Sequence, residues 1–238
     1  MNDAGAQVRA SLKALTREFD IIAHNLANVS TTAYKRRCSA FSNVLADQAG
    51  GNQDEGGAGT VDFSQGNLVE TGRTLDVALY GKGFFVVETP EGPLYTRHGL
   101  FRANQNGQIV DSEGRALAGT AGPLALPAAV DVSQVTVSQD GRISAAGALV
   151  GQFRIVDFAD KEDQLEPVGF GCYRAPQDAP PRDTEEVVVK QGYREASNVQ
   201  MVDELVGMIK VSRMYEANMK FVNARKDTTS SVIGVAMG

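Results

Sequence analysis

Tryptophan is absent from this sequence, and cysteine and histidine occur only twice each. Cys38 and Cys172 show neither a CxxC pair nor a metal-ligand spacing, so we expect two unrelated thiols. The alternative, a disulfide between them, would require an oxidising compartment. His24 and His98 have no cysteine or carboxylate at metal-ligand spacing. The sequence therefore predicts no metal site.

Catalytic and cofactor motifs are also missing. No GxSxG, phosphate-binding loop or HExxH sequence occurs, and Gly81-Lys82-Gly83 lacks the third glycine of a dinucleotide loop. We therefore predict that the protein is not an enzyme and binds no cofactor. An alternative, a wall hydrolase using a carboxylate pair, would have to draw on acids that we expect to be solvated loop charges: Asp157, Asp160, Glu162 and Asp163.

Charge and hydropathy exclude two further classes of partner. The formal net charge is −6, which is unfavourable for binding nucleic acid. No apolar run approaches the roughly 20 residues of a membrane span, so we expect no membrane insertion. Residues 1–7 lack a basic stretch and an apolar core. We expect either a cytosolic protein or one exported without a cleaved signal peptide.

The first thirty residues show a regular apolar pattern. From Asp3 to about Ser30 the sequence predicts one helix, on the order of 40 Å long at ~1.5 Å per residue. Its apolar residues repeat with 4-3 spacing, which is typical of a helix that packs along a partner helix. We call this pattern the N-terminal stripe: Val8, Leu12, Leu15, Phe19, Ile22, Leu26 and Val29.

A second helix is predicted near the C-terminus, beginning near Ser197 with a capping box formed by Ser197 and Gln200. It has the same 4-3 spacing with one polar interruption, and further apolar residues lie beside it. A helix that is apolar on several sides should be surrounded by other helices. We call its 4-3 pattern the C-terminal stripe: Met201, Leu205, Met208, Ser212, Tyr215, Met219 and Val222.

The middle of the chain predicts strands instead of helices. Short apolar runs such as Phe84–Val87 alternate with turn signals, among them Gln139-Asp140-Gly141. Strands without intervening helices favour an antiparallel arrangement. The predicted fold is α+β, with a coiled-coil-like layer of terminal helices (1–32 with 196–238), a flexible connector (33–60) and a central, mainly antiparallel β domain (61–195). The basic run Lys35-Arg36-Arg37 is expected to be a solvated turn.

Specific stretches of the sequence resemble one family. Residues 23–36 (AHNLANVSTTAYKR) resemble the N-terminal signature of bacterial flagellar rod, hook and hook-associated axial proteins, which reads Asn-Asn-Leu-Ala-Asn, Val, a Thr-rich turn and Gly-Phe/Tyr-Lys. The sequence differs from it at His24 and Ala33. Other stretches resemble the same family in the same order: residues 63–68, 71–79, 81–85, 95–99, 197–199, 202–205, 208–209 and 213–218.

A further set of stretches resembles one branch of the family more than the others. Residues 119–127 (GTAGPLALP), together with 140–144 and 151–158, are similar to the proximal-rod F-type proteins. The distal-rod G-type proteins resemble the sequence almost as closely. The single middle domain leaves no room for the additional outer domains of a hook protein.

The resemblance implies a structural subunit whose terminal helices form an inner layer around an export channel, with the β domain facing outward. It implies helical assembly with other copies and other flagellar rod proteins, export by the flagellar type III apparatus, and a place in the periplasmic rod of the basal body. An envelope- or peptidoglycan-binding module remains an alternative. The residues expected at the assembly interface are Val8, Leu12, Leu15, Phe19, Ile22, Asn25, Leu26, Asn28, Val29, Val202, Leu205, Met208, Ile209, Tyr215, Met219 and Val222.

Overall fold

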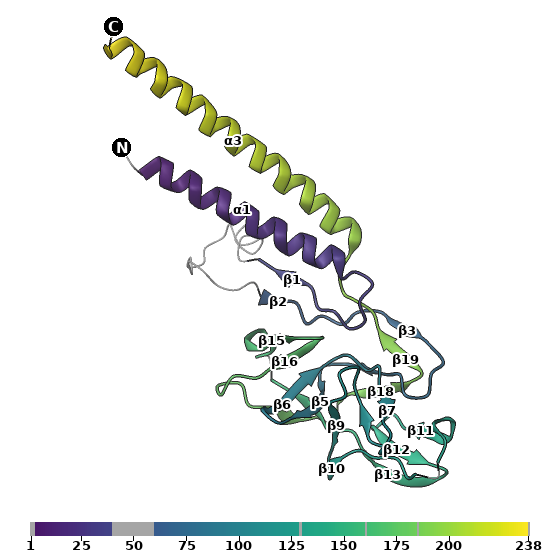
Figure 1. Ribbon diagram of the computed structural model, residues 1–238. Helices are drawn as coiled ribbons and strands as arrows, with labels where there is room; N and C mark the ends of the chain where they lie inside the picture. Colours follow the sequence, from purple (N-terminus) through teal and green to yellow (C-terminus); the bar gives the residue numbers. More distant parts are fainter. Residues whose placement is uncertain (1–2, 40–59, 129, 160, 185, 238) are drawn as a thin grey trace. The chain divides into compact units, whose positions relative to one another are not determined.

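The computed structural model describes residues 3–39, 60–128, 130–159, 161–184 and 186–237 (Figure 1). The chain divides into two compact units. The helical unit comprises Met1–Val29, Arg37–Val61 and Val199–Gly238, and the β unit comprises Ser30–Arg36 and Asp62–Asn198. The domain boundaries predicted from sequence stay predictions, because most of the expected connector, residues 40–59, lies outside the described residues.

The helical unit contains two helices and a short ribbon. Helix α1 spans Asp3–Ala27 and helix α3 spans Met201–Met237, while β1 (Arg37–Cys38) and β2 (Thr60–Val61) pair antiparallel. Helix α1 ends where the Asn28 amide bonds to the Asn25 carbonyl, at 3.0 Å, which tightens the last turn. Helices at both ends of the chain were predicted, and the structure confirms them.

The expected capping box at the start of the second helix is wrong. Helix α3 begins at Met201, and the Gln200 carbonyl accepts its first bond, from the Glu204 amide at 3.1 Å. Residues 197–198 therefore precede the helix, and Asn198 binds within the β unit instead. Its Oδ1 accepts from the Arg36 amide at 2.7 Å, and its Nδ2 donates to the Asp62 carbonyl at 2.8 Å.

The β unit is built from antiparallel pairings throughout its described strands, as predicted. Its largest sheet has ten strands, ordered β15-β16-β6-β5-β9-β8-β7, with β10 on β9, β14 on β5 and β17 on β14. Smaller sheets are β11-β12-β13, β18-β4 and β19-β3. Two 3-10 turns, η1 (Val132–Gln134) and η2 (Glu162–Gln164), complete it.

The bounds of these strands are as follows: β3 (Leu68–Glu70), β4 (Val77–Tyr80), β5 (Phe84–Thr89), β6 (Gly92–Thr96), β7 (Arg102–Ala103), β8 (Ile109–Val110), β9 (Ala116–Gly119), β10 (Gly122–Pro123), β11 (Val135–Val137), β12 (Arg142–Ala145), β13 (Ala148–Gln152), β14 (Ile155–Asp157), β15 (Glu166–Gly169), β16 (Cys172–Arg174), β17 (Arg182–Asp183), β18 (Val188–Gln191) and β19 (Tyr193–Glu195).

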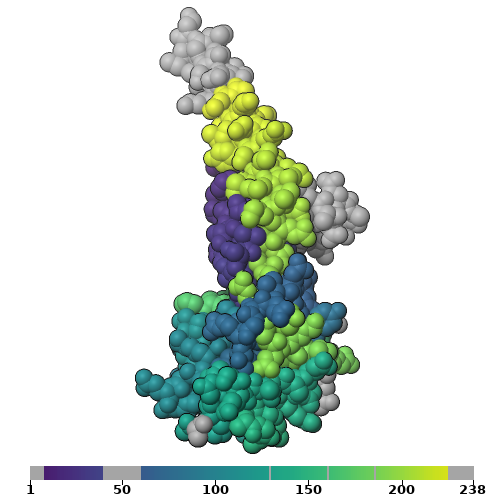
Figure 2. Space-filling view, turned by 90° about the vertical axis from the view of Figure 1, so that its right-hand side faces the viewer, coloured from purple at the N-terminus to yellow at the C-terminus, as the bar shows by residue number. Residues whose placement is uncertain are grey.

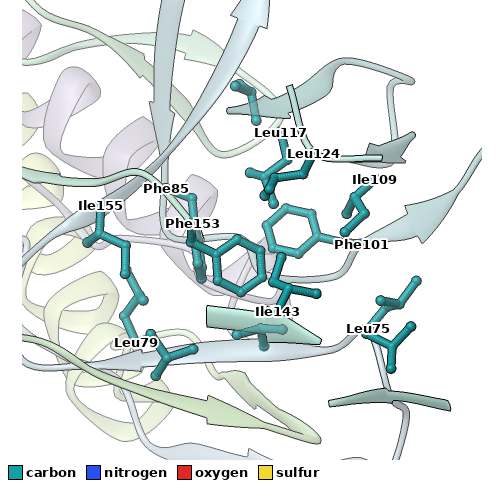
Figure 3. Close-up of a cluster of buried hydrophobic side chains, with 14 of the residues drawn as sticks. Leu75, Leu79, Phe85, Phe101, Ile109, Leu117, Leu124, Ile143, Phe153 and Ile155 are labelled. Carbon is teal, nitrogen blue, oxygen red and sulfur yellow. The ribbon is translucent and has the colours of Figure 1, made fainter. Parts of the chain in front are cut away.

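The core of the β unit gathers around strand β5, whose first four residues are all buried. Figure 3 shows Phe85 beside Phe101 and Phe153, and the ring centroid of Phe85 lies 5.2 Å and 5.5 Å from theirs in edge-to-face contacts. At Gly99 the backbone lies close to the backbone of β4. A side chain there has no room, because a Cβ would lie 1.6 Å from the Val77 carbonyl oxygen.

Two tight hairpin turns use residues that are unfavourable for them. In the turn between β15 and β16, Phe170 and Gly171 both have positive φ, and Phe170 is 71% exposed. Between β12 and β13, Ala146 and Gly147 form a turn of the same kind. A two-residue turn with positive φ at both positions favours Asn-Gly, because asparagine tolerates the left-handed region better than bulky residues.

We expect Phe170→Asn to raise the free energy of unfolding by about 1 kcal/mol, since it relieves left-handed strain and removes no buried contact. Urea unfolding of the purified protein measures the change. Ala146→Asn is the matched variant at the equivalent turn and should also stabilise. A loss of stability in both variants would contradict this account of the turns.

Among the described residues, no helix is both long and apolar enough to span a bilayer.

Candidate assembly interface

Helices α1 and α3 lie side by side and run antiparallel within the helical unit (Figures 1 and 2). Leu15 and Ile22 of α1 are buried against Val211 of α3, and Met208 packs on this cluster. Toward the free ends of the two helices, the Asn218 amide of α3 donates to Ser11 Oγ at 3.4 Å. The N-terminal stripe therefore faces α3 in part, although Phe19 stays 39% exposed.

The face of α3 turned toward α1 differs from the C-terminal stripe. Its buried residues are Glu204 and Val211, each adjacent to a member of the C-terminal stripe. Gly207 also belongs to this face, because a Cβ there would lie 3.3 Å from Ile22 Cδ1. Contact within one subunit consequently leaves much of the C-terminal stripe exposed.

An apolar surface remains on the first three turns of α3. Val202 is 71% and Ile209 55% exposed, and neighbouring apolar side chains are exposed with them. On a helical projection Val202, Val206 and Ile209 lie on the side opposite Glu204 and Val211, and Met201 and Leu205 lie on the flank between the two sides. We call this surface the outer patch: Met201, Val202, Leu205, Val206 and Ile209.

A groove follows the contact between the two helices. It has a volume of about 440 Å³ and is lined by Leu15, Thr16, Phe19, Val211, Ser212, Tyr215 and Glu216. Phe19 and Tyr215 belong to the set of residues expected at the assembly interface.

The asparagines of the N-terminal signature have separate roles. Asn25 is fully buried, and its side chain binds the Arg37 backbone and Glu204. The side-chain Nδ2 of Asn28 donates to the His24 carbonyl at 2.8 Å and lies 3.2 Å from His24 Nδ1, at the end of α1. Both asparagines therefore organise the C-terminal end of α1.

In the β unit, three charged side chains meet where the chain enters and leaves the unit. We call them the junction cluster: Lys35, Arg97 and Glu195. Lys35 Nζ lies 2.7 Å from Glu195 Oε1, and both side chains are at most 1% exposed. Lys35 also donates to the Ser64 carbonyl at 2.7 Å, and Arg97 Nη1 lies 3.7 Å from Glu195 Oε2.

Backbone groups complete the junction cluster. The Gly66 amide donates to Glu195 Oε1 at 2.9 Å, and a Cβ at Gly66 would lie 2.1 Å from the Ala196 carbonyl oxygen. The Ala33 amide bonds to the Glu195 carbonyl at 2.8 Å. Ala33 has φ +53, so the left-handed backbone persists although alanine replaces the glycine of the signature.

Burial lowers the pKa of the Lys35 ammonium below its ordinary value, and the Glu195 carboxylate opposes that shift. Without Glu195 the buried ammonium would have no compensating anion within hydrogen-bond distance among the described residues. The prediction of a solvated turn is wrong for Lys35, because a basic run usually indicates exposed charges and Lys35 is buried. The only available signal was the lysine of the family signature.

Comparison with known proteins decides the family. Residues 78–145 match the family described as "Flagellar hook protein FlgE/F/G D1 domain", and residues 190–235 match "Flagellar basal body rod FlgEFG protein C-terminal". The flagellar basal-body rod protein FlgG of Agrobacterium fabrum is 32% identical over 253 residues, covering 93% of this chain and 94% of the relative. The chain belongs to the flagellar basal-body rod protein family.

Both types of rod protein occur among the relatives of this rod protein. The rod protein FlgF of Caulobacter vibrioides is 31% identical over 231 residues, covering 92% of this chain and 91% of the relative. The rod protein FlgG of Bacillus subtilis is 27% identical over 256 residues, covering 95% of this chain and 96% of the relative. Identity to the two types is therefore nearly equal, and the family resemblance seen in the sequence is confirmed.

No group of three or more metal-ligating side chains occurs among the described residues of this rod protein. His98 is partly buried, and burial lowers its pKa below the ordinary value. Of the acids considered for an enzymatic pair, Asp160 lies outside the described residues. Asp157 is placed at the end of β14, and Glu162 and Asp163 form part of η2.

We expect Lys35→Met to lower the free energy of unfolding of the rod protein by about 3–5 kcal/mol, because it leaves Glu195 buried without its main cation. The double variant Lys35→Met/Glu195→Gln should lose less than the sum of the two single variants. Urea unfolding followed by circular dichroism gives both values.

Arg174→Met serves as the control, since it breaks an exposed ion pair with Glu91, whose atoms lie 3.2 Å apart. Such pairs contribute at most about 1 kcal/mol. Equal effects of Lys35→Met and Arg174→Met would show that the junction cluster has no special importance for stability.

Proposed function

We propose that this protein is a structural subunit of the flagellar basal-body rod, which assembles with its own copies and with other rod proteins through its terminal helices. The observation that carries the proposal is the outer patch on α3, whose residues Val202 and Ile209 are more than half exposed. Two helices of one subunit bury only part of their apolar surface. Neighbouring helices would bury the rest.

The mode of assembly follows from the asymmetry of these surfaces. The outer patch and the groove beside Phe19 differ in shape and composition, so contact between them joins different faces of two copies. Heterologous contacts that do not close generate a helical assembly. A coiled-coil layer of this kind would enclose the export channel, and its stacked subunits would transmit torque.

For position within the rod, we propose the proximal F-type place. The support is the resemblance of residues 119–127, 140–144 and 151–158 to F-type proteins, and the distal G-type place is the alternative. Basal bodies from a strain lacking this protein distinguish the two. A missing rod would support the proximal place, and a truncated rod that still enters the periplasm would support the distal one.

The proposed route and location follow from the same family. The subunit would leave the cytoplasm through the flagellar type III export apparatus, without a cleaved signal peptide, and reside in the periplasmic rod. We propose no catalytic activity, cofactor or nucleic-acid partner. If the β unit instead recognised peptidoglycan, purified cell wall would retain the isolated protein, whereas rod assembly alone predicts no retention.

We expect Val202→Asp and Ile209→Asp each to abolish incorporation into basal bodies, because either places a charge in the apolar contact between subunits. Immunoblots of purified basal bodies and swimming assays measure the effect. Lys210→Asp is the control: it also introduces an aspartate into an exposed position of α3, outside the outer patch. Normal motility of both patch variants would argue against assembly through this surface.

Deleting residues 1–29 or residues 199–238 should likewise abolish incorporation while leaving the β unit folded. The junction cluster and the large sheet lie entirely outside both deletions. Circular dichroism of the purified truncated proteins should retain the β signal and a cooperative unfolding transition. Entry of either truncated protein into basal bodies, with restored motility, would refute the proposed role of the helices.

A further inference from the structure

Two polar residues are buried in the contact between α1 and α3. Asn25 of α1 is 0% exposed and Glu204 of α3 is 2% exposed. Asn25 Nδ2 donates to Glu204 Oε1 at 3.3 Å. Burying such groups is unfavourable unless they find partners, so an alignment of the helices that separates them is disfavoured.

The Asn25 side chain is held in place by the backbone as well. Its Oδ1 accepts from the Arg37 amide at 2.9 Å, and its Nδ2 donates to the Arg37 carbonyl at 2.9 Å. These two bonds attach the end of α1 to the start of strand β1. The amide is thereby fixed in the orientation that presents its Nδ2 to Glu204.

A second polar contact agrees with the first. Ser11 lies two heptads before Asn25, and Asn218 lies two heptads after Glu204. In an antiparallel pair of helices, one alignment therefore satisfies both the Asn25–Glu204 bond and the Ser11–Asn218 bond. The apolar cluster of Leu15, Ile22 and Val211 lies between them.

The heptad repeat of the N-terminal stripe does not by itself select this alignment. Because the N-terminal stripe repeats every seven residues, sliding α1 by one heptad again places apolar residues on α3. A slide in one direction sets Asn25 opposite Val211, and a slide in the other sets Glu204 opposite Glu18. The first separates the Asn25 amide from Glu204, and the second brings the carboxylates of Glu204 and Glu18 together.

We propose that Asn25 and Glu204 are positioning residues that set a single register of α1 on α3. Buried polar pairs are known to specify register in helical assemblies, often at some expense of stability. The consequence for assembly rests on the proposed function: one register gives every subunit the same outer patch and the same groove.

A cross-linking experiment on the purified full-length protein tests the register. In a Cys38→Ser/Cys172→Ser background, the pair Ser11→Cys/Asn218→Cys reports the observed alignment. The pair Ser11→Cys/Val211→Cys reports an alignment slipped by one heptad. Both pairs remove the Ser11–Asn218 contact through Ser11→Cys, so that Asn25 and Glu204 then form the remaining one of these two polar contacts between the helices.

With Glu204 present, we expect the aligned pair to form its disulfide and the slipped pair to form little. Glu204→Leu should raise the ratio of slipped to aligned cross-link about tenfold, because leucine neither accepts from Asn25 in the aligned register nor repels Glu18 in the slipped one. Glu204→Gln keeps an acceptor for Asn25 but loses the carboxylate, so it should give a ratio between those of the parent and Glu204→Leu. Asp203→Leu, which places the same leucine on an exposed neighbouring position, is the control.

Three results would overturn the proposal: equal cross-linking of both pairs in the parent, an unchanged ratio in Glu204→Leu, or the same slip in Glu204→Gln as in Glu204→Leu. Helix content from circular dichroism must stay at the parent level in the variants compared. Since cross-linking is measured before any assembly, failure of the proposed rod function would leave these ratios unchanged.

Discussion

The buried ion pair between Lys35 and Glu195 is the interaction on which the boundary of the β unit depends. Lys35 comes from the segment that follows α1, and Glu195 from the segment that precedes α3. Their contact therefore joins the first and the last segments of the β unit. The Ser64 carbonyl and the Gly66 amide bind the same pair of charges. One ionic contact thus organises three segments that are distant in sequence.

The helical unit follows a different principle. Its polar contacts between α1 and α3 are specific, whereas the opposite side of the first turns of α3 carries exposed apolar side chains. Polar contacts are specific and weak in net stability, while apolar contacts are strong and tolerant of position. The contact between α1 and α3 therefore combines specific polar bonds with an apolar cluster, while further apolar area on α3 stays exposed.

Much of the fold could be predicted from the sequence, because its signals are local. The 4-3 spacing predicted α1, and the Asp140-Gly141 turn predicted the hairpin of β11 and β12, which the structure confirms. What could not be predicted depends on distant partners. From sequence, Lys35 is expected in a solvated basic run, because its partner Glu195 lies 160 residues away along the chain. The face of α3 turned toward α1 is offset from the C-terminal stripe and includes Glu204, whose bond to Asn25 periodicity does not reveal.

The outer patch has a thermodynamic consequence. It contains no charged side chain, and burial of such a surface is driven by the release of water near room temperature. The apolar part of a contact made there is insensitive to ionic strength, since screening acts on charges such as those of Asp203 and Lys210 beside it. Cooling weakens the same contact, because hydrophobic association loses strength at low temperature. Rods joined through this face would therefore tolerate changes in salinity far better than chilling.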